Sequence, residues 1–173
     1  MKILITFLFV CYMPFTAFAQ SQAGTGKYDL GTIDGTIEAL YASISGEKGA
    51  ERDWETFRML FRDGAKLMPA GSDQKGNISV QYWTPEEYIK QAGPFLVKNG
   101  FFEKEIQRKT DLFDPIAHVF STYISRNTEG GEIIARGINS IQLLNDGERW
   151  WVVNIYWVGE SDGREIPEEY DNN

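Results

Sequence analysis

The chain has 173 residues, of which 42% are hydrophobic, 14% aromatic and 24% charged, and its formal net charge is −8. This composition is typical of one globular domain with a sizeable core, and it excludes collagen-like, low-complexity and wholly disordered chains. The negative charge argues against a general binder of nucleic acid or of anionic membranes, which would need a basic surface.

A secretory signal peptide is predicted for residues 1–19. Lys2 supplies a short positive start, residues 3–10 form a nearly unbroken apolar run, and Ala17-Phe18-Ala19 is a small-residue cleavage site. We therefore expect an exported protein, periplasmic or secreted, with no stable membrane anchor after cleavage near Ala19.

Two alternatives for this segment are weaker. A permanent membrane anchor would need a longer apolar run than the one that Pro14 interrupts. Lipoprotein processing at Cys11 would require small residues before the cysteine, where the chain has Phe9 and Val10. Cleavage after Ala19 removes the only cysteine, so the mature chain would have no disulfide, no thiolate nucleophile and no cysteine-based metal site.

Helices are predicted in the first half of the mature chain, after a polar, flexible lead-in over residues 20–29. Apolar residues at helical spacing run from Ile33 to Ile44, and a second stripe from Trp54 to Phe61 begins at the N-cap Asp53 and ends at Gly64. The segment 84–87 (TPEE) is a strong helix start, and Gly93-Pro94 should kink or end that helix.

Strands are predicted in the second half. Residues 68–77 are rich in turn formers, and residues 78–83 could form a short strand. From residue 101 the apolar period becomes two, which predicts four strands over roughly 101–113, 115–126, 132–144 and 150–158. The fold class is therefore α+β, with N-terminal helices packed on one face of a bent antiparallel sheet over residues 30–160. Residues 161–173 form an acidic tail, in which Ile166-Pro167 and Tyr170 could make contacts.

Three stretches carry a resemblance to a known superfamily. They run from Arg52-Asp53-Trp54 to Leu67-Met68-Pro69, over residues 116–123 (IAHVFSTY), and over residues 136–143 (RGINSIQL) into residues 149–153 (RWWVV). Together they resemble the nuclear transport factor 2-like superfamily, also called SnoaL-like or cystatin-like, over roughly residues 30–160.

This resemblance implies a cone-shaped domain in which a strongly bent sheet wraps a long helix and leaves a pocket open at one end. It also implies a homodimer formed through a sheet face. Because the superfamily includes isomerases, cyclases, dehydratases, epoxide hydrolases and binding modules without chemistry, the fold leaves the function open.

The last strand supplies the first candidate site residues. Trp151 and every second residue after it form an apolar face, whereas the Trp150 face also carries Asn154 and Tyr156. Alternation alone would choose the Trp151 face as the core. The resemblance implies instead that the Trp150 face lines the pocket, which would place Asn154 and Tyr156 near it; the alternative is that both lie at an interface or in solvent.

Other candidates are polar or aromatic residues on faces that otherwise look buried. His118, the only histidine, is the natural proton carrier, with Tyr156 as a second acid–base candidate. Arg108 could hold an anion, although a surface cation is the simpler interpretation, and Asn139 is an isolated polar residue on an apolar face that needs a hydrogen-bond partner. Tyr41 and Trp54 lie on helix stripes, as core residues or as part of an apolar pocket.

No cofactor or metal is expected. The sequence has no phosphate-binding loop, dinucleotide fingerprint or nucleophile elbow, and one histidine without a clear carboxylate cluster gives no metal site. Glu103, Glu105 and Asp111 are assigned to a polar strand face and Asp53 to a helix cap, so the sequence shows no buried carboxylate base.

The favoured prediction is an exported binding or accessory module that holds a small, largely apolar ligand and forms a homodimer. The alternative is a SnoaL-like enzyme that carries out isomerisation, cyclisation or dehydration by proton transfer without a cofactor. A third hypothesis is a structural domain of the cell envelope with a filled pocket.

Overall fold

Helices precede most of the strands in the computed structural model, which describes residues 26–73, 75–161 and 163–171. The predicted signal peptide, residues 1–19, lies outside the described residues. The helices are α1 (Ile33–Ile44), α2 (Trp54–Leu60), α3 (Pro85–Asn99) and a short 3-10 helix, η1 (Glu168–Tyr170). The strands are β1 (Phe61–Ser72), β2 (Ile78–Val80), β3 (Phe102–Phe113), β4 (Ile116–Arg126), β5 (Ala135–Asn145) and β6 (Trp150–Gly159).

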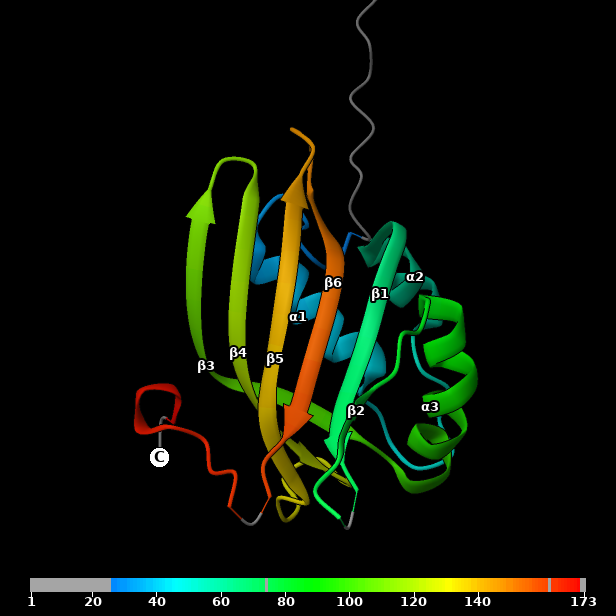
Figure 1. Ribbon diagram of the computed structural model, residues 1–173. Helices are drawn as coiled ribbons and strands as arrows, with labels where there is room; N and C mark the ends of the chain where they lie inside the picture. The colour runs from blue at the N-terminus through cyan, green and yellow to red at the C-terminus, as the bar shows by residue number, and fades with distance from the viewer. Residues whose placement is uncertain (1–25, 74, 162, 172–173) are drawn as a thin grey trace, which may run out of the picture.

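The strands form one sheet in the order β2-β1-β6-β5-β4-β3 (Figure 1). The α+β class and the four predicted C-terminal strands are confirmed. The expectation of a purely antiparallel sheet is wrong, because β1 and β6 are parallel and the other neighbouring pairs are antiparallel. The sequence also predicts turns over residues 68–77, yet β1 continues to Ser72. Pro69 pairs with β6 and Gly71 pairs with β2, and these pairings override the local turn preference of both residues.

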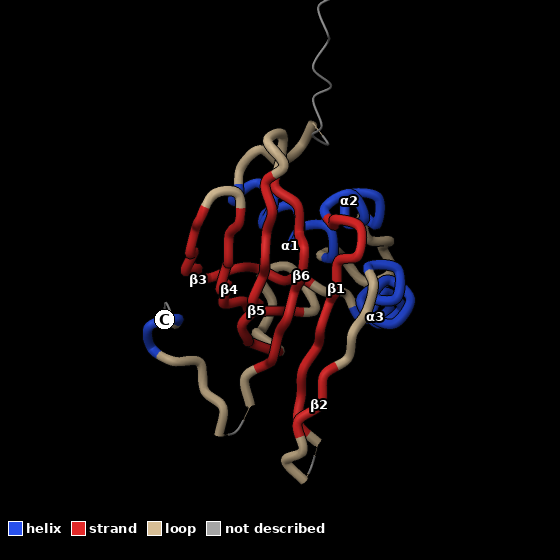
Figure 2. Tube along the Cα trace, turned by 45° about the horizontal axis from the view of Figure 1, so that its top comes forward, coloured by secondary structure: helices blue, strands red, loops and turns tan. Residues whose placement is uncertain are grey.

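The helices cover one face of the sheet, which we call the inner face; the opposite one is the outer face. In both views α1 crosses behind the central strands, and α3 lies beside β1 (Figures 1 and 2). The core lies between these layers, and Tyr28, within the predicted lead-in of residues 20–29, already belongs to it. The most deeply buried apolar side chains come from helices and strands alike: Leu30, Ile37, Phe57, Leu60, Val119, Ile141, Leu143 and Val152.

The predicted helix starts are confirmed by their caps. The side chain of Asp53 accepts a hydrogen bond from the backbone N–H of Thr56, and Thr84 forms a capping box with Glu87. The helix α3 passes through Gly93-Pro94 and ends at Asn99, so of the two predicted outcomes, a kink or an end, the end is wrong. Gly93 has a packing role, because a Cβ atom there would lie 3.1 Å from the Trp54 ring.

A bulge in β6 decides which side chains face inward. Val152 pairs with Leu143 and Asn154 pairs with Gln142, which leaves Val153 as an extra residue. An extra residue reverses the alternation of the strand beyond it. The first half of β6 therefore directs Trp150 and Val152 inward, whereas the second half directs Ile155 and Trp157 inward.

The C-terminal segment packs against the sheet. The Tyr170 ring meets Phe120 edge-on at 5.0 Å, and the Thr122 hydroxyl donates a hydrogen bond of 2.7 Å to the Tyr170 carbonyl. Arg136 pairs with Asp171 at 2.7 Å. Tyr170 is thus a contact point, as predicted, and the tail continues the fold beyond β6. Within the described residues, no helix is long and apolar enough to cross a membrane.

Candidate functional site

A cavity of about 360 Å³ lies between the helices and the inner face of the sheet. Its size falls within the range of small-molecule sites. Aromatic side chains dominate the wall and come from every layer around it: Tyr41, Phe57, Trp83, Tyr88, Phe101, Tyr123 and Trp157. The polar side chains in the wall are those of Glu103, Ser125 and Asn139, besides the tyrosine hydroxyls.

Among the described residues that line this wall, Glu103 alone carries an ionisable carboxyl group. The C-cap of α1 fixes its backbone, because the Glu103 N–H donates a hydrogen bond of 3.0 Å to Ser45 Oγ. The carboxyl Oε1 accepts a hydrogen bond from Asn139 Nδ2 at 3.3 Å. Burial raises the pKa of Glu103 to about 8, although the hydrogen bond from Asn139 acts to lower it. This carboxyl group is therefore mostly protonated at pH 7.

A chain of hydrogen bonds leads from Glu103 to the surface. Asn139 Nδ2 also donates to the Tyr41 hydroxyl at 3.0 Å, and that hydroxyl lies 2.7 Å from Ser121 Oγ. The Ser121 hydroxyl in turn donates to the Glu105 carboxylate. Burial raises the pKa of Tyr41, so its hydroxyl keeps its proton and remains a donor.

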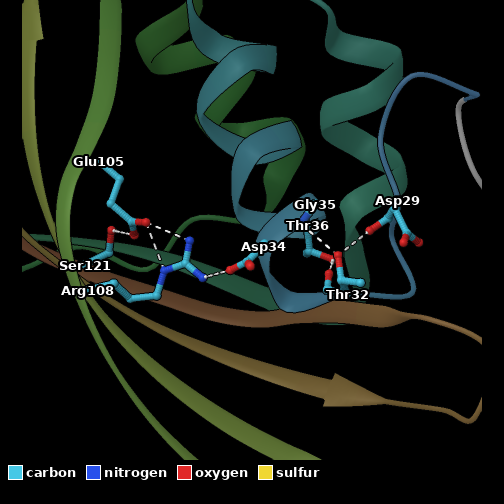
Figure 3. Close-up of polar contacts among 8 residues, drawn as sticks. All are labelled: Asp29, Thr32, Asp34, Gly35, Thr36, Glu105, Arg108 and Ser121. Atoms are coloured by element: carbon cyan, nitrogen blue, oxygen red, sulfur yellow. Dashed lines mark hydrogen bonds and ion pairs between the residues drawn. The ribbon is translucent and has the colours of Figure 1, made fainter.

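The chain ends in an ion-pair cluster at the rim (Figure 3). Arg108 donates to Glu105 at 2.7 and 2.9 Å and to Asp34 at the start of α1. The side chains of Arg108 and Glu105 are 21% and 18% exposed, whereas that of Asp34 is 89% exposed. Within the described part of the chain, the rim carboxylate of Glu105 thus has a charged partner, and the cavity carboxyl of Glu103 has none.

A second strand irregularity builds this arrangement. Glu105 pairs with Tyr123 and Gln107 pairs with Thr122, so Ile106 is an extra residue in β3. Without that bulge, Glu105 and Arg108 would lie on opposite faces of the strand. With it, both point to the inner face, opposite Tyr123 and Ser121.

Gly137 shapes the wall formed by Tyr123. The two residues are paired across β4 and β5, and a Cβ atom on residue 137 would lie 2.5 Å from the Tyr123 hydroxyl. A side chain at this position would displace the ring. The glycine is therefore needed for the close approach of Tyr123, and not for an unusual backbone angle.

Some of the residues that were predicted to line the pocket do so in the structure, and others lie elsewhere. Tyr41 and Asn139 line the cavity. Arg108 lies outside it and is held at the rim by its carboxylate partners. Trp150 is a core residue with 8% exposure, and Trp54 packs edge-on against Phe57, so neither contributes to the wall.

The predicted acid–base pair lies elsewhere. His118 is on the outer face, because Ala117 and Val119 point into the core, and its Nε2 is 2.8 Å from Ser140 Oγ. Tyr156 is 45% exposed, and Asn154 donates to Gln142 Oε1 at 3.0 Å. The expectation that Asn154 and Tyr156 face the pocket is wrong, because the Val153 bulge turns both outward.

Glu103 is the residue that the sequence analysis missed. Its assignment to a polar face is wrong: it shares the inner face with Phe101, and both line the cavity. The available signal was that apolar neighbour two positions away, together with Asn139 in need of a partner. The described residues hold no group of three or more His, Cys, Asp or Glu side chains that could bind a metal ion.

Comparison with known proteins rests on structure alone, since no family model and no curated protein matches the sequence. A Nostoc punctiforme protein of unknown function with a cystatin-like fold superposes with a TM-score of 0.57 at 13% identity, covering 74% of this chain and 88% of that one. A Mycobacterium tuberculosis protein of unknown function gives 0.56 at 13% identity, covering 79% and 75%. A nuclear transport factor 2-like protein of unknown function from Silicibacter pomeroyi gives 0.50 at 11% identity, covering 73% and 92%.

The chain has the nuclear transport factor 2-like, or cystatin-like, fold. The resemblance found in the sequence is thereby confirmed at the level of the fold. At these identities, a shared fold carries no shared function.

Proposed function

We propose that this nuclear transport factor 2-like protein is an exported module that binds a small, largely apolar molecule in the cavity of the sheet. The observation that supports it is a mainly aromatic wall with its polar groups, Glu103, Asn139 and Tyr41, gathered in one hydrogen-bonded cluster. Apolar walls favour transfer of an apolar ligand from water, and a few convergent polar groups orient it.

Filling the cavity tests this proposal. The neutral fluorescent probe 1-N-phenylnaphthylamine should bind the wild-type protein and raise its unfolding temperature, because a ligand that binds only the folded state stabilises it. Ala92→Trp on α3 places an indole in the cavity and should abolish probe binding. The matched control is Gln91→Trp, on the exposed side of the same helix. Equal binding by both variants, or no binding to the wild type, would refute the proposal.

Export rests on the signal-peptide pattern of residues 1–19. The full chain, expressed in a Gram-negative host, should be found outside the cytoplasm with Gln20 as its first residue, as determined by N-terminal sequencing. Recovery of the intact chain from the cytoplasm would contradict this part of the proposal.

We also propose that the chain forms a homodimer through the outer face. Phe113 and Ile116, which pair at the end of the β3–β4 hairpin and lie on the same face as His118, are 80% and 54% exposed, which leaves apolar surface on the outer face. Sedimentation at micromolar concentration should show a dimer that Phe113→Asp converts to monomer, whereas Tyr82→Asp, at another exposed position, should not. A monomeric wild type would refute the dimer.

The second candidate is the acid–base enzyme, and Glu103 gives it a specific basis. A cavity carboxyl with a pKa of about 8 can accept or donate a proton near neutral pH. His118 and Tyr156 lie outside the cavity, so this role would pass to Glu103. The test is deuterium exchange of the α-protons of 2-tetralone in D₂O: exchange above the buffer rate that Glu103→Gln removes supports catalysis, and its absence favours binding alone.

A further inference from the structure

The cavity combines two features that point to one class of ligand. Seven aromatic rings line it, and the described residues of its wall include no lysine, arginine or histidine. The face of an aromatic ring is electronegative and attracts cations, which is how proteins recognise quaternary ammonium groups. A wall of this composition favours a positive ligand over a negative one.

The second feature is that Glu103 has no charged partner among the residues that the structure describes. Its side chain accepts a hydrogen bond from the uncharged amide of Asn139 on β5. The titratable groups that face it are the tyrosines of the elements packed around it: Tyr41 on α1, Tyr88 on α3 and Tyr123 on β4.

Two arginines of a groove that Glu103 also borders are engaged with other partners. Arg108 is bound to Glu105 and Asp34, and Arg126 donates to the carbonyl of Gly131 at 2.7 Å. Neither arginine borders the aromatic cavity, although both lie along the neighbouring groove that Glu103 also borders. The side chains that line the cavity therefore provide no positive charge for Glu103, and a bound ligand would have to supply it.

We propose that the ligand is an organic monocation: an apolar body that carries one quaternary or protonated amine, with the charge placed among the rings and beside Glu103. This inference rests on the proposed binding function and names its ligand class. Burying a carboxylate without a partner is unfavourable, and a bound cation removes that penalty, whereas a neutral ligand does not.

Proton release follows from this arrangement. In the empty cavity Glu103 holds its proton at pH 7 because burial raises its pKa to about 8. A bound cation favours the ionised carboxylate, so binding at neutral pH expels the proton. Affinity for the cation should rise with pH until Glu103 is ionised without it, and affinity for a neutral ligand should not.

Two probes of nearly the same shape test the charge. Benzyltrimethylammonium carries a permanent positive charge, and neopentylbenzene replaces its nitrogen with carbon. Because neither probe titrates, any pH dependence belongs to the protein. Quenching of Trp83 and Trp157, both in the wall, reports binding. We expect the cation to bind at least tenfold more tightly than neopentylbenzene at pH 9, and at least tenfold more tightly at pH 9 than at pH 6.

Variants assign the effect to one residue. Glu103→Gln should reduce the affinity for the cation to that of neopentylbenzene and remove its pH dependence, while binding of neopentylbenzene persists. Glu38→Gln is the matched control, because Glu38 is exposed on α1 and its replacement changes the net charge equally. Calorimetry at pH 7 in phosphate and in Tris should show proton release on cation binding by the wild type and none by Glu103→Gln.

The remaining outcomes separate the two proposals. If neopentylbenzene binds as tightly as the cation at pH 9, or if only 1-N-phenylnaphthylamine binds, the ligand class is wrong and the binding function stands. If Glu38→Gln weakens cation binding as much as Glu103→Gln does, the effect is one of net charge and the inference is overturned. If no probe binds, both proposals fail.

Discussion

The cavity wall and the rim each contain a glutamate of β3, two residues apart, in contrasting surroundings. At the rim, Glu105 accepts hydrogen bonds from Arg108 and Ser121. In the wall, Glu103 accepts one from an amide and otherwise faces aromatic rings. The carboxylate at the rim is thus neutralised by an arginine of the same chain, whereas the carboxyl group in the wall has an uncharged amide as its partner. Since the residue type is the same, the difference lies in the partners that neighbouring strands supply.

This contrast separates stability from function. The charge of Glu105 is already matched by Arg108, which also binds Asp34 and so holds α1 against β3; this carboxylate is not available to pair with a ligand. A carboxyl group that remains without a counter-charge costs stability when ionised and is free to interact with whatever enters the cavity. Substitutions in the wall, at the rim and in the hydrogen-bonded link between them test this contrast through their effects on stability.

The largest effect is expected from Glu103→Gln at high pH. The ordinary pKa of a glutamate is 4.5, and burial raises that of Glu103 to about 8. Between these values the folded state holds a proton that the unfolded chain has lost, so the wild type loses stability as the pH rises from about 4.5 to about 8. The variant does not suffer this loss and should be more stable than the wild type by up to about 5 kcal/mol at pH 9, and by less than about 1 kcal/mol at pH 5.

Urea unfolding at both pH values measures this difference. Glu38→Gln, an exposed change of the same charge, serves as the control and should show no such dependence. If Glu103→Gln is no more stable at pH 9 than at pH 5 relative to the wild type, Glu103 is not a desolvated acid, and the contrast with Glu105 collapses.

Arg108→Met should leave the glutamate at the rim without a charged partner, as Glu103 is in the wall. It leaves the Glu105 carboxylate, whose side chain is 18% exposed, with the Ser121 hydroxyl as its remaining partner. We expect a loss of about 2 kcal/mol in the free energy of unfolding at pH 7, because a partly buried charge loses its partner. The double variant Glu105→Gln with Arg108→Met should recover at least half of it. A loss below about 0.5 kcal/mol would show that the rim pair behaves like an exposed one.

Tyr41→Phe should uncouple the two regions at a smaller cost. The phenol hydroxyl links Ser121 at the rim to Asn139 in the wall, and its removal leaves both with fewer partners. We expect a loss of about 1 kcal/mol in thermal or urea unfolding. Tyr82→Phe, at a tyrosine that is 65% exposed, should change stability by less than about 0.5 kcal/mol. Equal losses in the two variants would mean that the link contributes nothing.

The smallest effect is expected from His118→Gln. His118 lies on the outer face beside Ser140, away from both regions. Titration with 1-N-phenylnaphthylamine should give the same affinity as the wild type at pH 6 and pH 8. A tenfold loss of affinity would return His118 to the list of functional residues and would contradict the placement of the binding site.

Much of the fold could be predicted because local signals agreed with it. The cap at Asp53, the capping box at Thr84 and the period-two strands of the second half are local in sequence, and the structure confirms them. The pairing of β1 with β6 could not be predicted in this way. It joins segments some ninety residues apart, and Pro69 and Gly71 indicate a turn when they are considered alone.

The site was harder to predict because two extra residues decide it. Ile106 and Val153 each interrupt the alternation of a strand. Both are residue types that are common in regular strands, so neither marks a bulge in the sequence. Regular alternation placed Arg108 opposite Glu105, and the family resemblance placed Tyr156 in the pocket. Tyr41 and Asn139 were found because helix spacing and an isolated polar residue are signals that no bulge disturbs.

The extra residue at Val153 also makes this fold adaptable. If Val153 were instead paired in regular alternation, Asn154 and Tyr156 would turn toward the helices and the indole of Trp157 toward solvent. This change of pairing would exchange an aromatic lining for an amide and a phenol, while every helix kept its sequence. Gain or loss of a bulge in this strand is thus a short evolutionary route by which chains of this shape could acquire new ligand preferences.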